Sequence, residues 1–321
     1  MMMNNIKNFI EGSINVLILP HIHPDGDTLG SALALKLALV GMGKNAYIVI
    51  DDEIGSTLTF ITNENIMSTY EYDKLGIEAD LVISVDSSDA GRLGSRYRYI
   101  EEASKSINID HHKTNTEYCN LNLVDENSAA TGIIVYKLLE FLEVTITKEI
   151  AEAIYVAIVT DTGNFKYSNT DADTFLIAAS LIKAGIDNTT IINNLYQNKP
   201  LKELYLIREA LKNLTLYYNG KVSIIELNLE DFKANNISPT NTEGIIEFAR
   251  DIEGVEVAIF IKEIDFGIIK VSLRSKNHVD VSVIAQKFEG GGHSKAAGCS
   301  FDVSIKEVRE ILLDTFKEIF D

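Results

Sequence analysis

Short apolar runs that end in aspartate or histidine most constrain how this chain can fold. Residues 14–20, 81–85 and 106–109 are apolar enough, and short enough, to be buried strands. They lead directly into three polar motifs, His21-Ile-His-Pro-Asp25-Gly-Asp27, Asp86 and Asp110-His111-His112. The carboxyl ends of parallel strands meet at one edge of a sheet. The chain is therefore expected to adopt an α/β fold that gathers these motifs together.

Helical segments alternate with the strands in the first part of the chain. The sequence predicts largely buried helices over residues 28–42, 129–143 and 148–159, and a further strand over residues 46–50. Strands that alternate with helices indicate a doubly wound, mainly parallel sheet. We assign this domain to residues 1–190.

A second pattern follows a polar, asparagine-rich stretch. We expect a helical linker over residues 191–215 and a smaller α/β domain over residues 216–321. Within that domain the sequence predicts strands over 221–227, 255–262 and 267–273 and a closing helix over 304–320.

Composition limits the kinds of partner. The chain has 321 residues, is 46% hydrophobic and carries 29 basic against 47 acidic residues, a net charge of −18. These values support two cores but argue against a general binder of duplex nucleic acid, which must neutralise many phosphates. Cys119 and Cys299 have no metal or redox spacing, which fits a reducing cytoplasm. We find no signal peptide or membrane-spanning pattern.

The polar motifs indicate a metal site. Asp161, at the start of a predicted loop, adds a fourth group of ligands. Carboxylates with a minority of imidazoles suit Mn²⁺ or a similar ion, whereas thiolates, which favour zinc, are absent from these motifs. Asp86 is the best-placed carboxylate to bridge two cations. Two cations can activate water and polarise a phosphoryl oxygen, so no side-chain nucleophile is needed.

Each residue also has a structural interpretation. A single aspartate after a strand, such as Asp86 or Asp161, is usually a turn or cap residue. His23 is more often a solvated loop residue, and we do not select it. His112 could orient a ligand or contact the substrate phosphate, and we favour the second role. The four motifs together favour the metal site.

The second domain carries Gly290-Gly291-Gly292-His293. Three glycines let a backbone approach an anion closely and point its N–H groups at it, although a bare glycine run is more often a flexible loop. Arg274, on the polar side of a predicted strand, suits bidentate contact with phosphate and favours the anion interpretation. Lys270 and Ser272 share its face but could simply be solvated.

The ordered motifs resemble the DHH/DHHA1 phosphoesterase family over nearly the whole chain. The resemblance rests on HIHPDGDTLGS at 21–31, VDSSD at 85–89, NIDHHKTN at 108–115, VTDTGNFKYSNT at 159–170, and VSLRSK with GGGHSKAAG at 271–298. Within the family, the chain is similar to the branch of oligoribonucleases that also act on pAp, as is the segment 242–263. One departure is Glu289, where relatives often have another glycine.

The resemblance implies a site and a reaction. It implies two Mn²⁺ ions (or Mg²⁺ or Co²⁺) bound by His21, Asp25, Asp27, Asp86, His111 and Asp161. His112 would assist at the phosphate, and Asp110 would orient the two histidines. Substrate would lie in a cleft between the domains and contact Arg274, Gly290, Gly291, Gly292 and His293. The implied reactions are release of nucleoside 5′-monophosphates from RNA of about two to five nucleotides, pApA included, and conversion of pAp to AMP. A homodimer is also implied.

Three alternatives stay open from the sequence. An inorganic pyrophosphatase of the same superfamily would need a basic cluster to clamp both phosphates. A processive single-strand exonuclease resembling RecJ would need further binding modules, for which 321 residues leave little room. A catalytically silent nucleotide sensor would be expected to lack a ligand.

Overall fold

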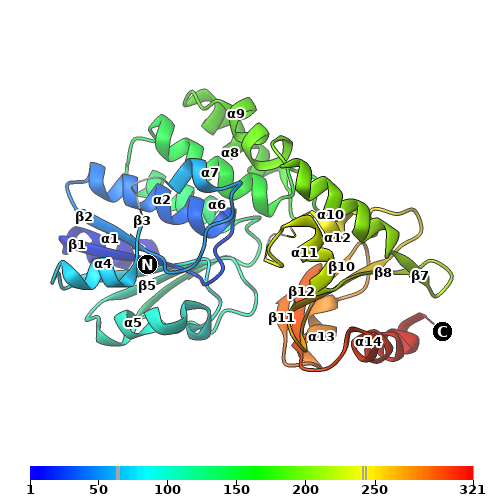
Figure 1. The fold of residues 1–321 in the computed structure, drawn as a ribbon. Coiled ribbons are helices and arrows are strands. Elements are labelled where there is room, and N and C mark those ends of the chain that lie inside the picture. Colours follow the sequence, from blue (N-terminus) through cyan, green and yellow to red (C-terminus); the bar gives the residue numbers. More distant parts are fainter. Residues whose placement is uncertain (63–65, 241, 243, 321) are drawn as a thin grey trace. The chain divides into compact units, whose positions relative to one another are not determined.

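The chain forms two compact units, Met1–Asn198 and Lys199–Asp321 (Figure 1). The structure is a computed structural model that describes residues 1–62, 66–240, 242 and 244–320, so residue 243 of the segment 242–263 lies outside the described residues. The segment 191–215, expected to be a linker, is divided between the units. Helix η3 (Asn193–Gln197) lies in the first unit and helix α10 (Leu201–Lys212) in the second.

A six-stranded sheet forms the centre of the first unit. Its order is β3-β2-β1-β4-β5-β6, and every neighbouring pair is parallel. The strands are β1 (Asn15–Pro20), β2 (Asn45–Val49), β3 (Ile66–Met67), β4 (Leu81–Val85), β5 (Ser106–Asp110) and β6 (Leu121–Val124). The predicted α/β fold with a parallel sheet is confirmed. The direction of winding reverses between β1 and β4, the position at which open α/β sheets bind ligands.

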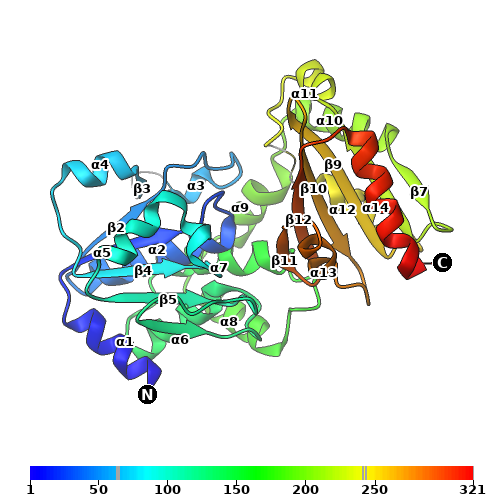
Figure 2. The same cartoon turned by 90° about the horizontal axis from the view of Figure 1, so that it is seen from below.

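Helices cover both faces of this sheet (Figure 2). One apolar cluster packs against α1 (Met2–Glu11), α2 (Gly26–Gly41), α6 (Thr131–Phe141), α7 (Lys148–Asp161) and α8 (Ala172–Lys183). A smaller cluster lies on the other face, with α4 (Thr69–Lys74), η2 (Ala90–Tyr97) and α5 (Arg98–Glu102). The short helices α3 (Thr59–Thr62) and α9 (Asn188–Ile192) complete the unit.

Helix α7 corrects one expectation. We predicted that the helix would end at residue 159 and that Asp161 would begin a loop, but α7 continues through Asp161. The threonine hydroxyls of Thr160 and Thr162 donate to the carbonyls of Val156 and Ile158, and the Thr162 amide also donates to Ile158. The backbone bond from Thr162 to Ile158 continues the helical turn, so Asp161 is delivered by a helix end.

A glycine sets how closely α2 approaches α7. A Cβ atom at Gly30 would lie 2.4 Å from the Ala153 carbonyl oxygen, closer than any real contact. Only glycine therefore allows this packing. The close approach fixes α2, which carries Asp27, relative to α7, which carries Asp161.

The second unit contains a mixed sheet in the order β11-β12-β10-β9-β8-β7 (Figure 2). Strands β8 and β9 are parallel and the other pairs are antiparallel. The strands are β7 (Thr215–Tyr217), β8 (Val222–Leu227), β9 (Val257–Asp265), β10 (Ile268–Ser275), β11 (Gly291–His293) and β12 (Ala296–Phe301).

Two separate apolar clusters lie on the two faces of this sheet. One involves α10, α11 (Leu229–Asn235) and α12 (Ile245–Arg250), and the other α13 (Val281–Gln286) and α14 (Ile305–Phe320). Helix α10 buries Leu206, Ile207 and Ala210 in the first of these clusters, so it belongs to the core of the second unit.

Among the described helices, none taken singly has the length and apolar composition needed to cross a membrane. One bent pair, Ala172–Lys183 with Asn188–Gln197, meets the length and composition criteria together, with a bend of 118° between its parts.

Candidate active site

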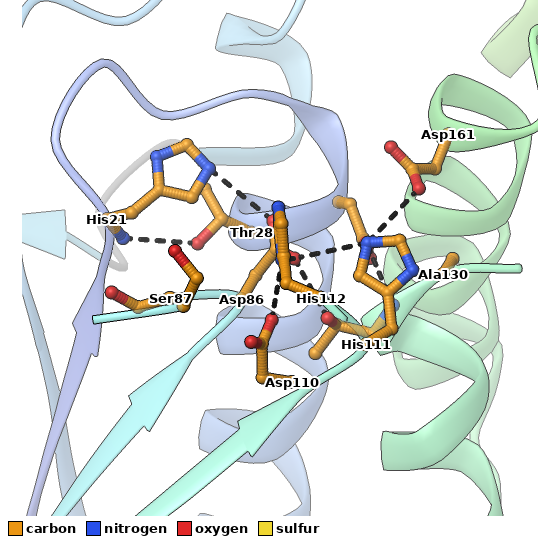
Figure 3. A network of polar contacts seen from close by, with 12 residues as sticks. His21, Thr28, Asp86, Ser87, Asp110, His111, His112, Ala130 and Asp161 are labelled. Carbon is orange, nitrogen blue, oxygen red and sulfur yellow. Dashed lines mark hydrogen bonds and ion pairs between the residues drawn. The ribbon is translucent and has the colours of Figure 1, made fainter. Parts of the chain in front are cut away.

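The motifs predicted from sequence meet at the carboxyl edge of the first sheet (Figure 3). His21 follows β1, Asp86 follows β4, and His111 and His112 follow β5, which ends at Asp110. Asp25 is the N-cap of α2, Asp27 lies in its first turn, and Asp161 is the last residue of α7. All predicted site residues of the first unit are therefore brought together by the two strands that flank the switch point, their neighbour β5 and two helix ends.

His21 faces two carboxylates with its Nε2 atom. Its Nδ1 lies 2.7 Å from the carbonyl oxygen of Ile22, and because that oxygen can only accept, Nδ1 carries the proton. Its buried Nε2 makes no hydrogen bond and lies 3.4 Å from Asp86 Oδ2 and 3.6 Å from Asp25 Oδ2. Three electron-rich atoms therefore face one another across a space of cation size.

His111 repeats this arrangement on the other side of Asp86. Its Nδ1 donates to the carbonyl oxygen of Ser128 at 3.1 Å. Its Nε2 lies 3.4 Å from Asp161 Oδ2, 3.7 Å from Asp86 Oδ1 and 3.8 Å from Asp27 Oδ2. Donation of the second ring N–H to a backbone carbonyl is how proteins orient histidines that ligate metals.

Asp86 belongs to both ligand groups. His21, Asp25 and Asp86 offer ligand atoms within 4.8 Å of one another, and so do Asp27, Asp86 and His111. The two carboxylate oxygens of Asp86 point to different histidines, Oδ2 to His21 and Oδ1 to His111. Its backbone is left-handed, with φ of 56°, an uncommon conformation for a non-glycine residue. Asp86 thus has the geometry of a bridging ligand.

Asp27 caps a helix that lies far away in the sequence. Helix α6 begins after Ala130, whose side chain cannot cap it. The Asp27 carboxylate accepts instead from the backbone N–H groups of Thr131 at 2.7 Å and Gly132 at 2.9 Å. The Thr131 hydroxyl also donates to Asp86 Oδ1 at 2.9 Å. The start of α6 therefore fixes two carboxylates of the site.

Asp110 orients His112, and these two residues offer ligand atoms within 4.8 Å of those of Asp86. The Nδ1 of His112 donates to Asp110 Oδ1 at 2.7 Å, and the side-chain amide of Asn115 donates to Asp110 Oδ2 at 2.6 Å. Asp110 is fully buried. Asp110 was expected to orient both histidines; its hydrogen bond fixes the ring of His112 beside Asp86, whereas His111 is held by the Ser128 carbonyl.

The electrostatics of the cluster favour a bound cation. Burial lowers the pKa of His21, but Asp25 and Asp86 outweigh burial and raise it to about 10. Burial also lowers the pKa of His111, and Asp161, Asp27 and Asp86 raise it to about 10. Burial and the Asp86 and Asp161 carboxylates raise the pKa of Asp27 well above its usual value. A divalent cation would relieve the same repulsion between carboxylates.

The residues present therefore fit two divalent cations. His21, Asp25 and Asp86 would hold one, and Asp27, Asp86, His111 and Asp161 the other. Oxygen-rich sets with one imidazole suit Mn²⁺ or Mg²⁺ better than zinc. His23, which we did not select, lies outside this set, with its Nδ1 3.6 Å from Asp52.

The sequence reasoning missed three supporting residues. Thr131, Ser128 and Asn115 make the contacts described above but were not selected. No signal in the sequence pointed to Thr131, because Ser128 directly precedes the predicted helix over 129–143 and is itself a suitable N-cap, whereas in the structure the helix begins after Ala130.

Arg274 and His293 lie in one row across the second sheet. Arg274 of β10 pairs with Ala296 of β12, and Ala296 pairs with His293 of β11. Directly paired residues of neighbouring strands share a face, so the two side chains leave the same face about 10 Å apart. The Nε of Arg274 lies 3.8 Å from Glu247 Oε1.

The glycine run forms an edge strand. A Cβ at Gly290 would lie 2.2 Å from the Gly298 carbonyl oxygen, and one at Gly292 would lie 2.5 Å from that of Ala296. Packing on β12 therefore requires glycine at both positions. A Cβ at Gly291 would meet nothing within 4 Å, so there is open space beside this position of the strand.

The chain was compared with known families and proteins. Residues 15–158 match the DHH family, N-terminal domain, and residues 219–321 match the DHHA1 domain. The bifunctional oligoribonuclease and PAP phosphatase NrnA of Thermus thermophilus is 33% identical over 310 residues, which cover 96% of this chain and 90% of that protein. The protein of the same name from Bacillus subtilis is 29% identical, with 93% of each chain covered.

A solved structure has the same fold over almost the whole chain. The exopolyphosphatase-related protein from Bacteroides fragilis superimposes with a TM-score of 0.91 at 26% identity, and the match covers 99% of this chain and 97% of that one.

Proposed function

Because the chain belongs to the DHH family and carries the DHHA1 domain, we propose that it is a phosphoesterase that hydrolyses short oligoribonucleotides and removes the 3′ phosphate of pAp. Curated relatives that match over most of their length are named for these two activities. The products would be nucleoside 5′-monophosphates from RNA of about two to five nucleotides, pApA included, and AMP from pAp.

The observation that carries this proposal is the position of Asp86 between two histidines. Each histidine donates its Nδ1 proton to a backbone carbonyl and turns its Nε2 toward the same carboxylate. Two divalent cations, which we propose to be Mn²⁺, would lower the pKa of water and neutralise charge on the phosphoryl group when bound there. The carboxylates Asp25, Asp27 and Asp161 would complete the two ligand sets.

The other residues of the first unit position these groups. The N-terminus of α6 holds Asp27, and the Thr131 hydroxyl holds Asp86, so neither carboxylate has to reorganise during the reaction. Asp110 accepts the Nδ1 proton of His112 and fixes the ring. We propose that His112 contacts the phosphate through Nε2 and stabilises its developing negative charge.

The second unit would select the substrate. We propose that Arg274 and His293, which share one face of the sheet, contact the part of the nucleotide that does not react, with Gly291 leaving room for the ligand beside the strand. The guanidinium of Arg274 can accept a phosphate or carboxylate bidentately. A cytoplasmic location, a homodimer and the exclusion of duplex nucleic acid remain predictions from the sequence.

A turnover panel tests the proposal. The purified chain would be assayed with Mn²⁺ on pAp, pApA, RNA of two to five nucleotides, cyclic di-AMP and pyrophosphate. We expect fastest turnover of pAp or of the shortest RNAs, and loss of turnover after exhaustive chelation with recovery on adding Mn²⁺. Full activity in a metal-depleted sample would refute the two-cation mechanism.

The same panel separates the alternatives. Faster release of phosphate from pyrophosphate than from pAp would favour a pyrophosphatase. Faster degradation of a 20-mer than of a dinucleotide would favour a processive exonuclease. No turnover of any compound, with tight binding of pAp, would favour a nucleotide sensor.

A further inference from the structure

The second unit contains a cavity of about 490 Å³ beside the sheet. Its polar lining comes from Lys262, Lys270, Ser272, Glu289 and Ser300, and glycine and apolar residues complete it. Lys270, Ser272 and Arg274 occupy every second position of β10, so all three side chains leave the same face of the sheet. The cavity therefore opens on the face that carries Arg274.

Two lysines, Lys262 and Lys270, line this cavity. Lys262 of β9 and Lys270 of β10 are directly paired across the sheet, an arrangement in which like charges are normally destabilising. The Nζ of Lys262 donates to two neutral oxygens, the Pro239 carbonyl and the Thr242 hydroxyl, each at 2.7 Å. Within the described ranges, neither lysine has an ion-pair partner.

The local charge favours an anion. Burial and the charge of Lys270 lower the pKa of Lys262 to about 8, so a nearby anion would stabilise its protonated form. Glu289 is the one acidic side chain in the lining, but it is exposed, whereas both lysines are half-buried. Solvent and salt screen the exposed carboxylate more effectively than the lysines. The hydroxyls of Ser272 and Ser300 add donors for an oxyanion.

The cavity is separate from the Arg274 row. Lys270 precedes Arg274 by four residues on the same strand, a separation of roughly 13 Å at the rise of a β-strand. Arg274 is not among the described residues that line the cavity, so a phosphate group held between the two lysines would lie away from it. The two positions can instead contact two phosphates of one extended ligand, or two different ligands.

We propose that Lys262 and Lys270 form a second phosphate-binding site, distinct from Arg274, which takes a phosphate group of a nucleotide. That the phosphate belongs to a nucleotide rests on the proposed function, whereas the anion site itself rests on the paired lysines. The phosphate could come from the distal part of a substrate with several nucleotides or from a free nucleoside monophosphate.

Lysine acetylation tests the site without using catalysis. The full chain would be treated with limiting acetic anhydride, alone and with orthophosphate, AMP or a phosphorothioate tetranucleotide, at matched ionic strength. Peptide mass spectrometry would then give the rate at each lysine. We expect at least one phosphate compound to slow acetylation of Lys270 several-fold, and to leave Lys306, an exposed lysine on α14, unchanged. Lack of protection of Lys270 by all three compounds would overturn the proposal.

Steady-state kinetics identify the source of the phosphate. If it belongs to a longer substrate, Lys270→Gln should raise KM for a tetranucleotide about tenfold more than KM for pAp, equivalent to about 1.4 kcal/mol of binding free energy. Lys270→Arg should restore the tetranucleotide KM, and Lys306→Gln is the matched control. If the ligand is a free nucleotide, AMP should protect Lys270 in the wild-type chain and the two KM values should change equally.

The two proposals can fail separately. A chain that turns over none of the phosphoesters but shows protection of Lys270 by orthophosphate would contradict the proposed function and support the site. An active phosphoesterase whose Lys270 is acetylated at the same rate with every phosphate compound would retain the proposed function without this site.

Discussion

The two units present opposite charges at the sites where we propose that phosphate binds. The first unit concentrates carboxylates in a buried cluster, where hydrogen bonds from α6 and Asn115 fix them in place. The second unit places Lys262, Lys270 and Arg274 on one face of a sheet, where they are half-buried. Arg274 lies 3.8 Å from Glu247, and the exposed Glu289 lines the cavity that holds the two lysines. The first arrangement needs cations before it can attract an anion, whereas the second can attract one directly. The net charge of a protein is therefore a poor guide to whether it binds phosphate, because here the proposed reaction centre is itself a cluster of acidic side chains.

Removing the shared carboxylate is the strongest test of this difference. Asp86→Asn should lower kcat/KM on pAp by more than about 1,000-fold, because both ligand groups lose a negative charge. Metal analysis should show fewer than two bound cations per chain. The control is His23→Asn, which alters an exposed histidine three residues before α2. It should leave kcat/KM and the number of bound cations near those of the wild type. If the Asp86 variant binds two cations and keeps full activity, Asp86 is not a ligand shared by two cations, and the contrast between the two units fails.

Changing Asp110, which holds His112, should lower activity less than changing a proposed metal ligand. Asp110→Asn should lower kcat by roughly 10- to 100-fold, the range expected when the partner of an active-site histidine is changed. Bound metal should stay at two cations per chain and KM for pAp should change little, because both Asp110 oxygens already accept hydrogen bonds, from His112 and Asn115. A loss of metal from this variant would instead make Asp110 a ligand.

In the second unit, a single change should affect binding more than chemistry. Arg274→Gln should raise KM for pAp by about tenfold, as expected for a lost charged hydrogen bond, with kcat nearly unchanged. Arg208→Gln on α10 is the matched control, since Arg208 is exposed and pairs only with its neighbour Glu209 among the described residues. A drop in kcat with constant KM would place Arg274 in the reaction itself.

The smallest expected effect concerns the stability of the second unit. Glu256 is buried and accepts hydrogen bonds from the backbone N–H groups of Asn277, His278 and Val279. Burial raises the pKa of Glu256, but these bonds outweigh burial and lower it to about 2. The lowered pKa means that the carboxylate stabilises the fold above pH ~4.5, and that this stabilisation is lost as the pH falls through 2.

Glu256→Gln should therefore lower the free energy of unfolding at pH 7 by about 1 kcal/mol. Hydrogen exchange in β9 and β10 would measure the change, with the exposed Glu318→Gln as control. The difference between variant and wild type should shrink as the pH falls from 4.5 to 2. A difference that grows on acidification would contradict the assigned pKa direction.

The sequence predicted the strand-end ligands of the first unit for a physical reason. Ligands at strand ends, such as His21 and Asp86, follow continuous apolar runs that are visible in the sequence. The end of α7 was missed because its backbone hydrogen bonds continue past the apolar segment into Thr160, Asp161 and Thr162. Asp27's contact with Thr131 was missed because it joins residues 104 positions apart. The pairing of Lys262 with Lys270 depends on strand register, which a single sequence does not specify.

The contact between Asp27 and the start of α6 has a consequence for how the protein is made. Asp27 and Asp86 leave the ribosome well before Thr131 and Gly132, the backbone groups that fix Asp27, and Thr131 also holds Asp86. A nascent chain that ends before residue 131 therefore has the acidic side chains but not their arrangement. The ordered cation site can form only after α6 has been synthesised and has docked, so metal loading reports completion of the first unit.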